Sequence, residues 1–185
     1  MANGRPPLRR SSPPKGEYGL MRKTVVWCVG NPILQDDGAG PELYRRLSGT
    51  PVAGLVAVDC GVTPENHVAP LAKLIREDAG ESPLLIVVDA ADMGLPGGSI
   101  RRISPGDLAD VPLGAHGIPL DLVLSPLLPD MELVIIGIQP ARRGLGDSLS
   151  PEVADAVSRL ASVIREGRWD EIEPCRPYQE NCSPR

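Results

Sequence analysis

The run LLIVV at residues 84–88 is the most apolar stretch of the chain, and it ends at Asp89. Five consecutive aliphatic residues, three of them β-branched, are typical of a strand that is buried on both faces. Such a strand lies in the interior of a sheet that helices cover on both sides. We therefore take residues 84–88 as the central strand of an α/β fold.

Shorter apolar runs on either side of this segment predict the remaining strands. They share β-branched and aliphatic residues and end at polar or glycine-containing loops. The run at residues 99–103 is the weakest of them. The others are residues 23–30 (KTVVWCVG), 52–59 and 132–138 (ELVIIGI).

Helical periodicity fills the intervals between the strands. A helix opened by Thr63 and Pro64 is expected to bury Val68, Leu71, Leu74 and Ile75, and Pro70 inside it predicts a break. Ser150 is expected to cap the last helix, with Pro151 at its first position. The two other predicted helices cover residues 39–47 and 119–127.

This alternation of strands and helices predicts a parallel or mostly parallel sheet with helices on both faces. Residues 1–22 are rich in Pro, Ser and Arg and are expected to be a disordered basic tail. The folded domain is expected over residues 23–167, and residues 168–185 are expected to form a loose, polar C-terminal tail in which Cys175 and Cys182 could pair.

Charge and composition narrow the classes of function. The whole chain has a net charge of −5, although residues 1–23 carry six basic side chains and one acidic. An acidic body lacks the basic surface that nucleic-acid binding needs, and aromatic residues make up only 3% of the chain. No stretch is long and apolar enough to cross a membrane. The sequence contains no Cys-x-x-Cys pair, so a zinc site of the usual spacing is not expected. We expect a cytoplasmic monomer.

Polar residues that follow the predicted strands are the candidates for chemistry, because ligands of such sheets bind at the carboxyl ends of the strands. Asp36 and Asp37 follow the first strand, Asp89 ends the central one, and His116 precedes a predicted helix. The first loop does not suit a phosphate, because two adjacent carboxylates would repel it. Two carboxylates and one imidazole suit a divalent metal ion with open coordination positions, or the carboxylates could activate water as general base and acid. The residue pattern leaves both open.

Four ordered motifs resemble those of the hydrogenase maturation proteases. They run from about Lys23 to Arg165 and look closest to the branch that processes the large subunit of the formate-hydrogenlyase hydrogenase. Pro64-Glu65-Asn66 also fits that branch. The motifs are Gly30-Asn31 with Asp36-Asp37-Gly38-x-Gly40, Val88-Asp89-Ala90-Ala91-Asp92-Met93-Gly94, His116-Gly117-Ile118-Pro119-Leu120, and Gly137-Ile138-Gln139-Pro140.

The resemblance implies a three-layer αβα sandwich, phosphorylase/hydrolase-like, with a twisted, mostly parallel sheet of about five strands. It also implies an endopeptidase that removes a short C-terminal extension from a NiFe hydrogenase large-subunit precursor after nickel insertion. The metal-contacting and catalytic residues then correspond to Asp37, Asp89 and His116, which would sense nickel held by the precursor. Asp36 is expected to matter less, and Asn31 and Gln139 to orient loops or peptide.

Two other functions remain open on the sequence. A Rossmann-like nucleotide- or cofactor-binding protein, such as a methyltransferase, would use Asp59 at the end of the second strand to contact a ribose. A nickel-checking chaperone would bind the precursor without cutting it. Tight binding of a nucleotide cofactor would support the first, and a precursor-processing assay would separate the second from a protease.

Overall fold

A computed structural model describes residues 22–77, 82–104, 122 and 124–175. One five-stranded sheet forms its middle layer, with strand order β2-β1-β3-β5-β4. The first four strands in this order are mutually parallel, and β4 runs antiparallel to β5 at one edge. The strands are β1 (Thr24–Val29), β2 (Leu55–Gly61), β3 (Leu84–Ala90), β4 (Ile100–Ile103) and β5 (Glu132–Ile138).

The prediction that residues 84–88 form the central strand is confirmed. β3 lies between β1 and β5, and every one of its residues is buried. It continues two residues further than predicted, so Asp89 belongs to the strand and pairs with Gly137 of β5. This places the Asp89 carboxylate at the carboxyl end of the sheet instead of in the following loop.

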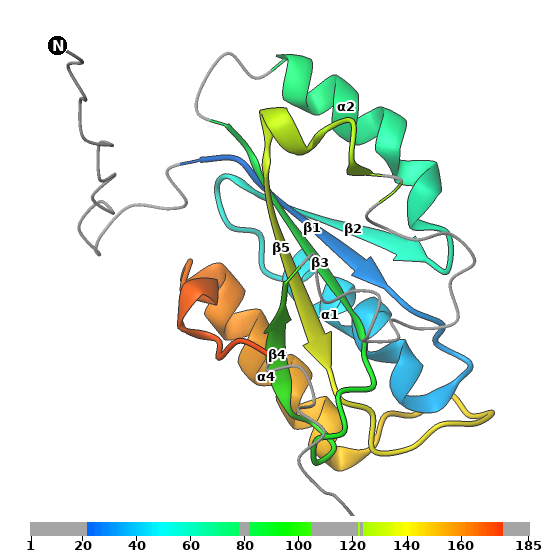
Figure 1. The fold of residues 1–185 in the computed structure, drawn as a ribbon. Coiled ribbons are helices and arrows are strands. Elements are labelled where there is room, and N and C mark those ends of the chain that lie inside the picture. The colour runs from blue at the N-terminus through cyan, green and yellow to red at the C-terminus, as the bar shows by residue number, and fades with distance from the viewer. Residues whose placement is uncertain (1–21, 78–81, 105–121, 123, 176–185) are drawn as a thin grey trace, which may run out of the picture.

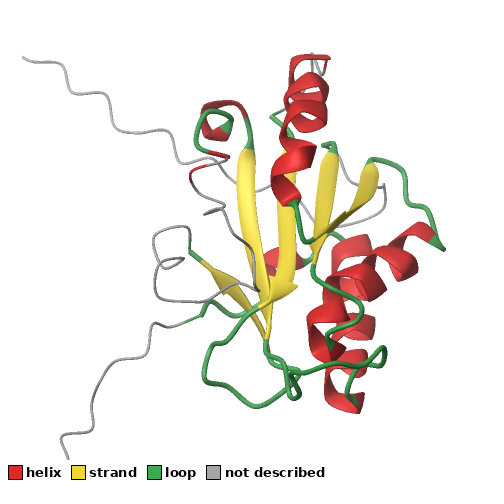
Figure 2. Ribbon diagram, turned by 90° about the vertical axis from the view of Figure 1, so that its right-hand side faces the viewer, coloured by secondary structure: helices red, strands yellow, loops and turns green. Residues whose placement is uncertain are grey.

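Helices cover both faces of the sheet, as the alternating pattern predicts (Figures 1 and 2). On one face, α1 (Ala39–Ser48) and α4 (Pro151–Arg165) pack together over alternate residues of the inner strands, such as Val26 and Val88. On the other face, α2 (Val68–Glu77) packs over the intervening residues, such as Trp27 and Val87. The α/β class and the mostly parallel five-stranded sheet are thus confirmed.

The second helix differs from its prediction in one respect. Residues Pro64–His67 form a 3-10 turn, and the α-helix begins only at Val68. Pro70 therefore lies in the first turn of α2, where the missing N–H costs no hydrogen bond, and it does not break the helix. Leu71 is buried, with the other expected inward residues packed around it.

Residues 168–175 are held against the sheet and are not loose, in contrast to the expectation for this segment. The backbone N–H of Arg102 in β4 donates to the carbonyl oxygen of Glu173 at 2.9 Å, and the N–H of Cys175 donates to Arg102 at 2.6 Å. The segment thus covers the outer edge of β4 at this position, which an unpaired strand would leave open. Cys182, with which Cys175 could pair, lies outside the described residues, as does most of the helix expected at residues 119–127.

Candidate functional site

The topology places two of the three predicted site residues on the same edge of the sheet. Asp37 lies in the 3-10 turn η1 (Gln35–Gly38) that follows β1, and Asp89 lies at the end of β3. β1 and β3 are hydrogen-bonded neighbours, and η1 packs against β3. His116, the third predicted residue, lies outside the described residues.

Glycines let the loop after β1 fold tightly around Asp37. Gly30 has φ +144°, and a Cβ atom there would lie 2.0 Å from the carbonyl oxygen of Asp37. A Cβ on Gly40 would lie equally close to the carbonyl oxygen of Val29. The glycines of the Gly30 to Gly40 motif are therefore needed for close backbone approach, which is a steric role and not a phosphate-binding one.

The Asp37 carboxylate is oriented by the loop that it closes. Its Oδ2 accepts a hydrogen bond from the backbone N–H of Asn31 at 2.9 Å, and the Asn31 side chain in turn accepts one from the N–H of Ile33 at 3.2 Å. The side chain of Asp37 is half-buried. One carboxylate oxygen is thus fixed, and no hydrogen bond within the described residues holds the other. Asn31 orients this loop, as expected.

Asp36 has a different role from its neighbour. It is completely buried, and its carboxylate accepts hydrogen bonds from Ala141 N (2.9 Å), Arg142 N (2.6 Å) and both the N–H (2.6 Å) and hydroxyl (2.9 Å) of Ser150. Ser150 occupies the N-cap position of α4, but its hydroxyl donates to Asp36 and makes no capping bond to the helix. Asp36 therefore joins the loop after β1 to the segment between β5 and α4.

Asp89 is buried as well, with 2% of its surface exposed, and its Oδ1 accepts a hydrogen bond from the N–H of Ala90 at 2.8 Å. A carboxylate buried at a strand end and pre-oriented by a backbone N–H is suited to contact a group that approaches the end of the sheet. Its pairing with Gly137 places β5 alongside, and a Cβ on that glycine would collide with Ala91 and Ile103.

Gln139 fixes the loop that follows Asp89. Its Oε1 accepts hydrogen bonds from the N–H groups of Met93 at 2.7 Å and Leu95 at 3.2 Å, and its Nε2 donates to Asp92 at 3.3 Å. The side chain is only 7% exposed. Its expected role in orienting a loop thus has a structural basis in these contacts.

Gln35 is a candidate functional residue that the sequence pattern did not identify. It is the one non-glycine residue with positive φ, +49°, in the described ranges. A left-handed conformation is strained for Gln and is a reason to look for function. No sequence signal was available for it, because this position carries neither the Gly nor the Asn that usually marks such a conformation.

Within the described residues, no group of three or more His, Cys, Asp or Glu side chains could hold a metal ion. The trio predicted from the sequence needs His116 and is untested by this finding. Cys28 and Cys60 are not available as thiolates: burial raises the pKa of both, that of Cys60 to about 12, and Cys60 and Asp59 act in the same direction on Cys28.

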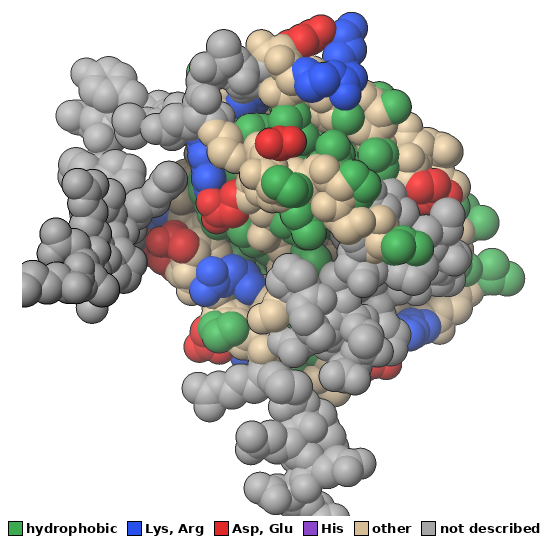
Figure 3. Space-filling model, turned by 45° about the horizontal axis from the view of Figure 1, so that its top comes forward, with side chains coloured by type: hydrophobic (Ala, Val, Ile, Leu, Met, Phe, Trp, Pro, Cys, Tyr) green, Lys and Arg blue, Asp and Glu red, His purple; other side chains and the backbone are tan. Residues whose placement is uncertain are grey.

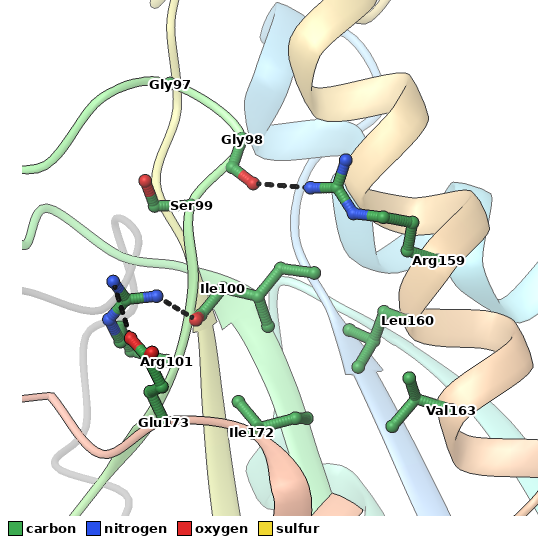
Figure 4. Close-up of a pocket in the computed structure, with 10 residues that line it drawn as sticks. All are labelled: Gly97, Gly98, Ser99, Ile100, Arg101, Arg159, Leu160, Val163, Ile172 and Glu173. Atoms are coloured by element: carbon green, nitrogen blue, oxygen red, sulfur yellow. Dashed lines mark hydrogen bonds and ion pairs between the residues drawn. The ribbon is translucent and has the colours of Figure 1, made fainter.

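A cavity of about 420 Å³ lies on the flank of the sheet between β4 and α4 (Figure 4). Arg159 donates to the carbonyl oxygen of Gly98 at its upper end, and Leu160 and Val163 form one wall. Neither Asp37 nor Asp89 lines it. The cavity is therefore separate from the strand ends that carry the two carboxylates.

On one face of the molecule, the surface charge is mixed. On the face shown in Figure 3, acidic and basic side chains are interspersed around exposed hydrophobic ones, and no continuous basic area is visible. Asp59, the residue required by the nucleotide-binding alternative, lies on edge strand β2 and accepts a hydrogen bond from the N–H of Gly61 at 3.1 Å. No helix in the described part of the chain has the length and hydropathy needed to span a membrane.

Comparison with known proteins identifies the family. A family profile described as hydrogenase maturation protease matches residues 41–166, which include Asp89 and His116 and begin just after Asp37. The chain belongs to the hydrogenase maturation protease family. It is 36% identical over 138 residues to the hydrogenase 3 maturation protease of Escherichia coli K12, covering 74% of this chain and 85% of that protein.

Solved structures of this family share the fold. The solution structure of an Escherichia coli endopeptidase of the family is 32% identical, with a TM-score of 0.72, covering 85% of this chain and 99% of that one. The crystal structure of a NiFe hydrogenase maturation protease from Thermococcus kodakarensis is 27% identical, with a TM-score of 0.67, covering 79% and 92%. This chain is a hydrogenase maturation endopeptidase, so the prediction of an enzyme of this class is confirmed.

Proposed function

We propose that this endopeptidase removes the C-terminal extension of a NiFe hydrogenase large-subunit precursor once nickel has been inserted. Asp37, Asp89 and His116 would recognise the nickel that the precursor carries. The observation that supports this most is the placement of two oriented carboxylates in a protein of this family, Asp37 in the turn that follows β1 and Asp89 at the end of the neighbouring strand β3. We place the reaction in the cytoplasm, because that compartment keeps buried cysteine thiols reduced.

The chemistry of the donors fits a metal that arrives with its own thiolate ligands. Carboxylate oxygen and imidazole nitrogen can occupy open positions on such an ion without extracting it. Each carboxylate is held in place by a backbone N–H before the metal arrives, Asp37 by Asn31 and Asp89 by Ala90. Recognition would then report that nickel insertion is complete before the peptide bond is cut.

The test is conversion of a nickel-loaded precursor to its mature form, followed on a gel. We expect Asp37→Asn, Asp89→Asn and His116→Ala each to slow conversion by about 100-fold or more, because each removes a metal contact. Circular dichroism would verify that the variants are folded. A precursor without nickel should be processed poorly by the wild-type protein.

Asp59→Asn is the matched control, because it changes an exposed carboxylate at the end of β2, outside the proposed site. It should process at the wild-type rate. If Asp37→Asn and Asp89→Asn also process at the wild-type rate, nickel recognition by these residues is wrong. Tight binding of a nucleotide cofactor that Asp59→Asn abolishes would instead support the Rossmann-like alternative.

A further inference from the structure

A cavity of about 410 Å³ lies directly beside the loop that carries Asp36 and Asp37. Pro32 and Gln35 of this loop line one side, and Asp147 and Leu149 of the segment before α4 line another. In Figure 1 the loop between β1 and α1 and the loop between β5 and α4 lie next to each other at the lower end of the sheet. The cavity is thus located where the carboxyl ends of the strands are.

Gln35, in the wall of this cavity, has an unusual backbone conformation. Its backbone is held at φ +49° while its N–H donates to the carbonyl oxygen of Gly146 at 2.8 Å. No hydrogen bond within the described residues holds its side-chain amide. Left-handed backbone in a residue other than glycine costs roughly 1–2 kcal/mol, and such strain concentrates at sites that bind ligands. A side-chain amide carries both donors and an acceptor, so it can pair with the peptide group of an extended chain.

Two large apolar side chains stand next to this wall. Ile33 is 60% exposed and Leu145 is 83% exposed. The carbonyl oxygen of Ile33 accepts a hydrogen bond from the N–H of Gly146 at 3.0 Å, so the two loops run side by side at this point. These two exposed aliphatic side chains on adjoining loops offer apolar contact area to a partner that binds at the cavity.

The charged groups around the cavity indicate the character of that partner. Glu42 is shared by two arginines: the Arg45 guanidinium makes two hydrogen bonds to it at 2.7 Å and Arg46 makes one at 2.7 Å, and these bonds lower the pKa of Glu42. Asp147 forms no ion pair with any described residue. The acidic Glu42 and Asp147 thus stand beside the basic Arg45 and Arg46 with no net charge, so the cavity favours a neutral segment over a strongly charged one.

We propose that this cavity, with Ile33 and Leu145 at its margin, docks an extended, neutral segment of the precursor polypeptide, and that the Gln35 amide binds its backbone. The proposal rests on the proposed function, since it names the part of the enzyme that holds the same substrate. Gln35 and Asp37 belong to the same 3-10 turn. A segment seated here is therefore positioned close to the carboxylate proposed to contact nickel.

Gln35→Gly is the most informative variant, because it removes the amide and also relieves the backbone strain, so a loss of function at an unchanged Tm is not due to misfolding. We expect an unchanged or higher Tm and a KM for nickel-loaded precursor raised about tenfold, with kcat changed less than twofold. The double variant Ile33→Ser/Leu145→Ser should raise KM at least as much, as truncated interface anchors do. Val62→Ser, an exposed apolar residue after β2 (46% exposed), is the control and should leave KM unchanged.

Processing by the wild-type protein tests the proposed function, whereas the ratio of variant to wild-type KM tests the docking site. Wild-type KM in both Gln35→Gly and the double variant would overturn the site while leaving the function intact. Sedimentation velocity adds a second measurement. If the wild-type protein self-associates and the double variant does not, with KM unchanged, the surface binds a second copy of this chain and the proposal is wrong.

Discussion

Replacing Asp36 with Ala should destabilise the fold severely. The carboxylate has no exposed surface and accepts four hydrogen bonds, from Ala141 N, Arg142 N and the N–H and hydroxyl of Ser150. A hydrogen bond to a charged group contributes about 1.5–3 kcal/mol, and each donor left buried without a partner carries a further cost. Because bonds that share one acceptor do not add, we expect a loss of about 3–5 kcal/mol in the free energy of unfolding.

The measurement is urea denaturation followed by circular dichroism, with thermal unfolding alongside. At about 2–4 °C per kcal/mol for a domain of this size, the Tm should fall by about 6–20 °C. Ser150→Ala removes one of the four donors and should cost about 1 kcal/mol. Asp59→Ala, the exposed control, should cost about 0.5 kcal/mol or less. A loss below about 1 kcal/mol for Asp36→Ala would refute the assignment of Asp36 as the anchor between the two loops.

Three further predictions concern other features of the molecule. Protein purified without added metal should contain far less than one equivalent of zinc or nickel by elemental analysis, because two carboxylates and one histidine without a thiolate form a weak, open site; near-stoichiometric metal would contradict this. Gln139→Leu should lose about 2 kcal/mol in urea denaturation and slow processing, because the N–H groups of Met93 and Leu95 lose their acceptor. Since burial raises the pKa of Cys60 to about 12, the folded thiol stays protonated where the unfolded one ionises, so stability should fall above about pH 9. Relative to wild type, Cys60→Ala should therefore gain about 1.4 kcal/mol per pH unit between about pH 9 and 11, and a constant difference would show that the thiol is accessible.

The sequence predicted the strands well because their burial is encoded locally. Uninterrupted apolar runs such as residues 84–88 have few alternatives to a strand between two helical layers, and β3 is fully buried as predicted. The second helix was less well predicted, because Pro70 is compatible both with a broken helix and with a helix that begins at Val68. Which of these occurs depends on the 3-10 turn before it, and that turn has no distinctive sequence pattern.

The sequence could not predict hydrogen bonds between residues that lie far apart in the chain. Ser150 precedes Pro151 as a capping serine would, and its position at the N-cap was predicted correctly. Its hydroxyl nevertheless donates to a carboxylate 114 residues earlier in the chain, which no local pattern could indicate. The strained backbone of Gln35 depends likewise on Gly146, which is far away in sequence and paired with this loop only in the folded protein.

Asp36 and Asp37 are adjacent in one short turn, but Asp36 supports the fold whereas Asp37 is the proposed metal contact. Neighbouring residues in a 3-10 turn point about 120° apart, so Asp36 and Asp37 cannot serve the same partner. Asp36 is directed into the protein, where three backbone N–H groups and the Ser150 hydroxyl donate to it, and Asp37 is left half-buried in the turn after β1 with one oxygen held by Asn31. Substitution of Asp36 should therefore lower stability and processing together, whereas Asp37→Asn should lower processing alone. In the proposed site, Asp37 is the one of these two acids that contacts the substrate's metal, and Asp36 stabilises the loop that presents it.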